Sequence, residues 1–239
     1  MANDVVAPPG PAAAALAEAD ALVAEGRSAD AIASLTDANR ARRDPAIERR
    51  LVALRHAAAA GFGDRPQVGF EPPRAVPLEH PGDLPSITRS ELSVAALRDG
   101  FSRHGCLRVD GLISQDRALG LAAGIDRALE AFDAADAAGV DHDDDGWFSQ
   151  FTPDPGAYRV GGRRKWVRAS GALWTADSPR MLFQLFELID ETGIGALVSE
   201  YLGERPALSA NKCTLRRVPL DTNVGWHQDG AFLGEQVRT

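Results

Sequence analysis

The chain has 239 residues, of which 44% are hydrophobic and 25% charged, a composition typical of a globular protein with one or two domains. Its formal net charge of -8 argues against a surface that binds nucleic acid or an anionic membrane, so we expect no nucleic-acid partner. The sequence contains no run of about 18 apolar residues, and we therefore expect no membrane-spanning helix.

The cysteine content and the N-terminal residues indicate a reducing compartment. Cys106 and Cys213 lie far apart in the sequence and lack the spacing of a metal site, so we expect two free thiols. The first residues carry Asp4 and lack the basic segment of a secretory signal. We predict a cytoplasmic location.

Residues 11–60 predict short helices separated by turns. Apolar residues recur at helical spacing, Ser28 is positioned to cap the second helix, and Asp44 followed by Pro45 is typical of the start of a third. The three helices resemble a tetratricopeptide-type hairpin. Two roles stay open for residues 11–60: an arm for docking a protein partner or for self-association, or a helical extension packed against the rest of the chain.

Residues 61–87 are rich in proline and glycine. Proline lacks an N–H donor and disfavours helix at the residue before it, so this stretch predicts a linker. We therefore divide the chain into a helical region (1–60), a linker (61–87) and a second domain (88–239).

Helices precede strands in the second domain. Thr88 and Glu91 form a capping box that predicts a helix to about residue 104, and Ser114 is positioned to cap a long helix after a strand at 105–113. Charged and apolar residues mix over 163–171, which we interpret as a strand.

The last third of the chain predicts two further helices and two strands. Asp177 is a candidate cap for a helix that Gly193 ends, and a helix over 194–202 follows. Strands are predicted over 207–218 and around His227. This order predicts an α+β fold with helices on one side of a sheet.

An acidic loop covers residues 141–146 and has the form D-x-D-x-D-G, as in the first half of a calcium-binding EF-hand loop. The twelfth position of such a loop should be a glutamate, and here it is Thr152. We interpret the segment as a solvated acidic loop rather than a calcium site.

The segment Gly225-Trp226-His227-Gln228-Asp229-Gly230 carries the main candidate site. Residues two apart on an extended strand point to the same side, so His227 and Asp229 could converge on one cation. An imidazole and a carboxylate are two of the three ligands in the 2-His-1-carboxylate triad that binds non-haem Fe(II).

Residues 92–239 resemble the phytanoyl-CoA dioxygenase family of Fe(II)- and 2-oxoglutarate-dependent oxygenases. The segments that carry the resemblance are Gly105 to Ile113, Leu173 to Arg180, Glu200 to Gly203, Asn211 to Leu215 and Trp226 to Gly230. The resemblance implies a partial double-stranded β-helix (jelly-roll) with flanking helices. It also implies hydroxylation of a small organic substrate, with Fe(II) as cofactor, 2-oxoglutarate as co-substrate, and release of succinate and CO2.

The resemblance also implies roles for individual residues. His227 and Asp229 match the first two iron ligands of the family. Gln228 stands where the family often has a glutamine that reaches 2-oxoglutarate. Lys165 resembles a lysine that contacts the carboxylate of the co-substrate, and Lys212 is a weaker candidate for that role.

The sequence departs from the family pattern after Asp229. Family members have a distal histidine ligand, and an arginine that pairs with 2-oxoglutarate, on later strands. Neither is found before Thr239 in a matching context. We therefore expect a C-terminally truncated oxygenase domain that is inactive alone.

Two alternatives to an oxygenase stay open. The chain could be a non-catalytic helical adaptor with a degenerate oxygenase domain, in which residues 11–60 bind the partner. It could also hold a different metal, such as Zn or Mn in a cupin-like site, although such sites usually draw in more histidines, and His227 is the one histidine near this motif in the sequence.

Overall fold

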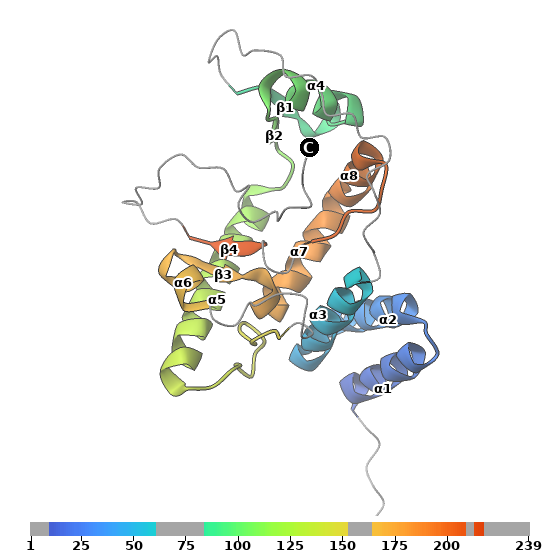
Figure 1. Cartoon of the computed structure of the whole chain (residues 1–239), viewed down its shortest axis with the longest axis vertical. Coiled ribbons are helices and arrows are strands. Elements are labelled where there is room, and N and C mark those ends of the chain that lie inside the picture. The colour runs from blue at the N-terminus through green and yellow to red at the C-terminus, as the bar shows by residue number, and fades with distance from the viewer. Residues whose placement is uncertain (1–9, 61–83, 153–163, 209–212, 218–239) are drawn as a thin grey trace, which may run out of the picture.

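The computed structural model describes residues 10–60, 84–152, 164–208 and 213–217. Helices dominate these ranges, and the strands among them are short. In Figure 1, α7 (Pro179–Thr192) and α8 (Ile194–Leu202) run through the middle of the molecule. The N-terminal helices lie below them, and α4 (Val94–His104) packs on α8 at the top.

The N-terminal helices are α1 (Pro11–Ala24), α2 (Ser28–Ala41) and α3 (Pro45–Ala60), so the prediction of three helices in this region is confirmed. The Asp44 carboxylate accepts the N–H of Ala46 at 2.8 Å, as expected of a cap. The predicted cap at Ser28 is wrong by one position, because Ser28 is already the first residue of α2.

Apolar side chains from all three N-terminal helices form one core, and α7 contributes Phe183 to it. The buried members of this cluster are Ala19, Ala31, Leu35, Ile47, Leu51, Leu54 and Phe183. Because α3 also packs directly on α7, the N-terminal helices share their core with the rest of the described chain.

The predicted capping box of Thr88 and Glu91 is present, but it caps the start of a 3₁₀ turn and not the start of the predicted helix. Glu91 accepts the N–H of Thr88 at 2.8 Å within a 3₁₀ turn, η1 (Arg89–Glu91). The helix itself, α4, begins later and is capped by the Ser93 hydroxyl. Strand β1 (Ser86–Thr88) before the turn pairs in parallel with β2 (Arg108–Asp110).

The long helix α5 (Gln115–Ala138) begins where its cap predicts, with the Ser114 hydroxyl accepting the N–H of Arg117 at 3.2 Å. One face of α5 packs against α7 in a second core, which contains Ala128, Leu129, Phe132, Leu173, Met181 and Leu215. The two helices approach closely at Gly124, where an added Cβ would lie 2.5 Å from the sulfur of Met181.

The predicted strand over 163–171 is wrong, because the structure has a short helix, α6 (Arg164–Ala169), there. Arg164 and Val167 lie one helical turn apart and are both buried, so their spacing suits a helix that packs on one side. Strand β3 (Ala172–Trp174) follows and pairs antiparallel with β4 (Thr214–Arg216), with Leu173 opposite Leu215. Between β3 and α7 lies a second 3₁₀ turn, η3 (Thr175–Asp177).

The predicted fold class is also wrong for the part of the chain that the structure describes. Each described strand has three residues, and the strands form two-stranded sheets, so no partial double-stranded β-helix (jelly-roll) is present in these ranges. The α+β expectation of helices on one side of a sheet fails for the same reason. The apolar residues of the second half are buried mainly by helix-to-helix packing of α5 and α7.

Candidate functional site

The residues of the predicted iron site, His227, Gln228 and Asp229, lie outside the described residues, as does Lys212. The last described segment before this motif in the sequence is β4 with its neighbours Cys213 and Arg217.

Lys165, predicted to contact the co-substrate from a strand, lies on the helix α6. Its side chain is 81% exposed, and its ammonium nitrogen lies 3.2 Å from a carboxylate oxygen of Asp136 on α5. Such an exposed pair contributes little to stability. The structure thus gives Lys165 a surface position, and its role toward a co-substrate stays a prediction.

Cys213 joins β4 to the turn η3. Its carbonyl oxygen accepts the N–H of Thr175 at 3.0 Å, and the Thr175 hydroxyl lies 3.3 Å from the sulfur. Both cysteines of the chain, Cys106 and Cys213, are free and partly buried. The start of β4 is therefore held by two contacts to one residue.

A pocket of about 420 Å³ lies beside this junction, a size typical of small-molecule sites. Its walls come from α2, α3, η3, α7 and residues 205–208, and Cys213 contributes as well. The N-terminal helices and the second half of the chain therefore build it together. Sequence reasoning missed this pocket, because it depends on the packing of α3 against α7.

A buried ion pair supports one wall of the pocket. The Arg164 guanidinium donates to both carboxylate oxygens of Asp177, at 2.7 and 3.0 Å, and also to the carbonyl oxygen of Phe151, a pocket residue. The Asp177 carboxylate also accepts the backbone N–H of Phe151 at 2.8 Å. Burial raises the pKa of Asp177, and the hydrogen bonds and charge of Arg164 oppose that rise.

The sequence predicted different roles for Arg164 and Asp177. Asp177 was expected to cap α7, but the residue at the cap position is Ser178, and Arg164 was expected on a strand. The spacing of thirteen residues between them carries no local pattern. Only the fold reveals this ion pair.

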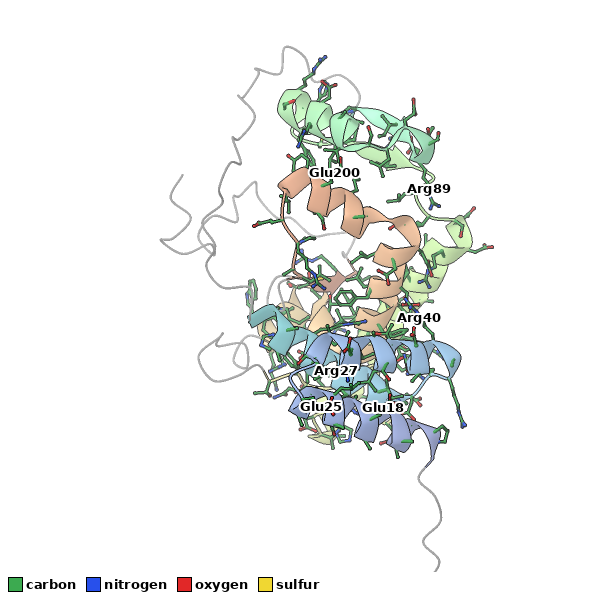
Figure 2. The ribbon with its side chains drawn as sticks, turned by 90° about the vertical axis from the view of Figure 1, so that its right-hand side faces the viewer. Glu18, Glu25, Arg27, Arg40, Arg89 and Glu200 are labelled. Carbon is green, nitrogen blue, oxygen red and sulfur yellow. The ribbon has the colours of Figure 1, made fainter. Side chains whose placement is uncertain are left out.

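Three arginines line the pocket, Arg40, Arg55 and Arg205, and the first two have different surroundings. Arg40 on α2 pairs with Glu187 at 2.8 Å and Asp190 at 3.1 Å, both on α7, and Figure 2 shows it on the side of α2 that faces α7. Arg55 on α3 stacks on the Phe186 ring, with 4.0 Å between the guanidinium carbon and the ring centroid, and donates to the Thr36 hydroxyl at 3.3 Å. The pocket therefore presents a guanidinium beside an aromatic wall.

A second charged cluster surrounds Glu48 on α3, whose side chain is 0% exposed. Its carboxylate accepts hydrogen bonds from Asn39 at 3.3 Å, from Arg43 at 3.2 Å and from Arg180 of α7 at 3.3 Å. Burial raises the pKa of Glu48, and Arg43 and Asn39 act in the opposite direction. The cluster joins the N-terminal helices to α7 and is structural in character.

In the acidic loop of residues 141–146, the Asp143 carboxylate stabilises the turn by accepting backbone hydrogen bonds. Asp143 accepts the N–H of Gly146 at 2.6 Å and that of Trp147 at 3.2 Å. Gly146 has a φ of +77°, a conformation that favours glycine. Within the described ranges, no group of three or more His, Cys, Asp or Glu side chains is placed to hold a metal ion.

Among the helices that the structure describes, none has both the length and the apolar character needed to cross a membrane. Comparison of the sequence and the structure with protein-family models, curated proteins and solved structures finds no match.

Proposed function

We propose that the chain carries the first two iron ligands of an Fe(II)- and 2-oxoglutarate-dependent oxygenase, a class of enzyme that hydroxylates small organic substrates, and that these 239 residues are inactive alone because the distal histidine and the arginine of the family have no match among them. The observation that carries this proposal is the His227-Gln228-Asp229 motif, in the order of segments that resembles the phytanoyl-CoA dioxygenase family. An imidazole nitrogen and a carboxylate oxygen are donors that suit Fe(II), so the chemistry of the donor set fits the metal.

In this proposal His227 and Asp229 bind the iron, and Gln228 orients the co-substrate. Bound Fe(II) together with 2-oxoglutarate would supply the oxidising chemistry that inserts one oxygen atom into a C–H bond, with release of succinate and CO2. A reducing cytoplasm would suit a protein with two free cysteines and a ferrous cofactor.

The test is anaerobic titration of the full chain with Fe(II), with and without 2-oxoglutarate. With two protein ligands, we expect Fe(II) to bind weakly and 2-oxoglutarate to add at most a weak metal-to-ligand charge-transfer band, with no succinate formed on exposure to air. A full-strength band and succinate would show that these residues are active alone. Replacing a metal ligand should lower the affinity by more than about tenfold, since even residues that only support a ligand have effects of that size. His227→Ala and Asp229→Ala should therefore both lose Fe(II) and the band.

The matched control is His142→Ala, which removes an exposed histidine of the acidic loop whose ring contacts Asp141 at 2.8 Å. It should bind Fe(II) like the unchanged chain. Equal Fe(II) affinity in the unchanged chain and in His227→Ala would refute the proposed iron site. It would favour the non-catalytic adaptor, whose protein partner at residues 11–60 stays a prediction.

A further inference from the structure

The pocket between the N-terminal helices and α7 offers a binding site that the iron motif does not explain. Its apolar wall is formed by Ile32, Val52, Phe151, Leu182, Phe186 and Leu208. Burial of such side chains against a hydrocarbon body is favourable, in proportion to the apolar area removed from water. The pocket therefore suits a ligand with an apolar part.

Arg55 is one of three arginines that line the pocket, and the other two, Arg40 and Arg205, already have partners. The Arg55 guanidinium packs on Phe186 and donates to Thr36, and it makes no ion pair with any described carboxylate. The acidic side chains near it are already engaged, because Glu187 and Asp190 pair with Arg40. Burial lowers the pKa of Arg55 to about 10, and the more distant charges of Asp190 and Glu187 partly oppose this. The group is still a cation at neutral pH.

We propose that this pocket binds a small monocarboxylate with an apolar body, whose carboxylate pairs with Arg55 and whose hydrocarbon part lies along the apolar wall. A guanidinium presents parallel N–H donors that match the two oxygens of a carboxylate. A single carboxylate is favoured over two, because Arg55 is one cation and the other two arginines of the pocket already have partners: Arg40 pairs with Asp37, Glu187 and Asp190, and Arg205 is engaged as well. None of the residues that carry this proposal belongs to the His227 motif.

The probe is octanoate, titrated calorimetrically into the full chain in the presence of a metal chelator. Octylamine, which has the same number of carbon atoms and the opposite charge, is the ligand control. We expect octanoate to bind and octylamine to bind at least about tenfold more weakly, as expected when a partly buried charge loses its partner. Equal binding of both would show that only the apolar wall is used and would overturn the proposal.

The variant that tests the arginine is Arg55→Gln, which should weaken octanoate binding by more than about tenfold. Its matched control on the same helix is Arg50→Gln, because Arg50 pairs with Asp20 at 2.7 Å and does not line the pocket. Arg50→Gln should bind octanoate normally. Unchanged binding by Arg55→Gln would contradict the proposal.

Two further measurements keep the test independent of the folding of Arg55→Gln. Ala59→Phe places a ring in the pocket without changing any charge and should also abolish binding. In a Cys106→Ser background, octanoate should slow the alkylation of Cys213, which lines the pocket. Octanoate that leaves the alkylation rate unchanged would place the ligand elsewhere. His227→Ala should bind octanoate normally, so failure of the iron site and failure of this site can be told apart.

Discussion

Glu48 is a carboxylate that the fold removes from water and surrounds with donors. Its neighbours Arg43 and Arg180 carry positive charge, yet the pKa of Glu48 is raised, because the cost of burying the charged form is the largest effect. A buried ion pair is for this reason weak evidence of stabilisation. The residue instead fixes how α3 meets α7.

The raised pKa predicts how stability depends on pH. Between its ordinary value of 4.5 and the raised pKa, the folded chain binds more protons at Glu48 than the unfolded chain does. The contribution of Glu48 to the free energy of unfolding must therefore fall as pH rises through this range, and it stays constant above it. We expect the stability of the unchanged chain, measured relative to Glu48→Gln by urea unfolding, to decrease over this range.

The control for this prediction is Glu18→Gln, since Glu18 is exposed on α1 (Figure 2). Its pH profile should run parallel to that of the unchanged chain. A stability difference between the unchanged chain and Glu48→Gln that grows with pH would mean that the ion pairs outweigh the cost of burial.

At the scale of single elements, the start of α5 shows how a local pattern fixes a helix. Ser114 caps this helix through the N–H of Arg117, which would otherwise have no partner within the helix. Ser114→Ala should lower the free energy of unfolding by about 1 kcal/mol, the usual cost of losing such a cap. Chemical denaturation measures this directly.

The control for Ser114→Ala is Ser102→Ala, because Ser102 lies inside the helix α4 and not at its start. Its hydroxyl bonds back to the carbonyl of Arg98 at 2.6 Å and caps nothing. Ser102→Ala should therefore cause no loss of stability. If the free energy of unfolding fell equally in Ser114→Ala and Ser102→Ala, the effect at position 114 would not come from capping.

The same contrast between local and distant causes explains how far the sequence could predict the fold. The starts of α3 and α5 and the end of α7 follow from the adjacent residues Asp44, Ser114 and Gly193, and these predictions are confirmed. The strand predicted over 163–171 is wrong, because a distant partner, Asp177, buries Arg164 on one side of a short helix. Contacts of this kind leave no local pattern.

The candidate sites differ in the same way. The His227-Gln228-Asp229 motif could be recognised from sequence, because its donors are adjacent, although its geometry lies outside the described residues. The pocket could not be recognised, because Arg55 and Cys213 line it only through the packing of α3 on α7 and the contacts of Cys213 with Thr175. Apolar spacing predicted the helices but not which of their faces would meet.

At the scale of the whole molecule, the contact between the N-terminal helices and α7 decides whether the chain unfolds in parts. Phe183 of α7 is 9% exposed and belongs to the same core as Leu35 and Leu51. The ion pairs of Arg40 with Glu187 and of Glu48 with Arg180 cross the same boundary. The helices of residues 11–60 thus depend on α7 for part of their core.

Phe183→Ala should therefore destabilise both sides of this boundary. Truncating a buried phenylalanine costs about 3–5 kcal/mol, and hydrogen exchange should show protection falling together in α2 and α7. Leu119→Ala, which truncates a side chain that is 60% exposed on α5, should change stability by no more than about 0.5 kcal/mol. If α2 kept its protection while α7 lost it, the N-terminal helices would be stable alone, and the pocket between them and α7 would lie at a boundary between independent units.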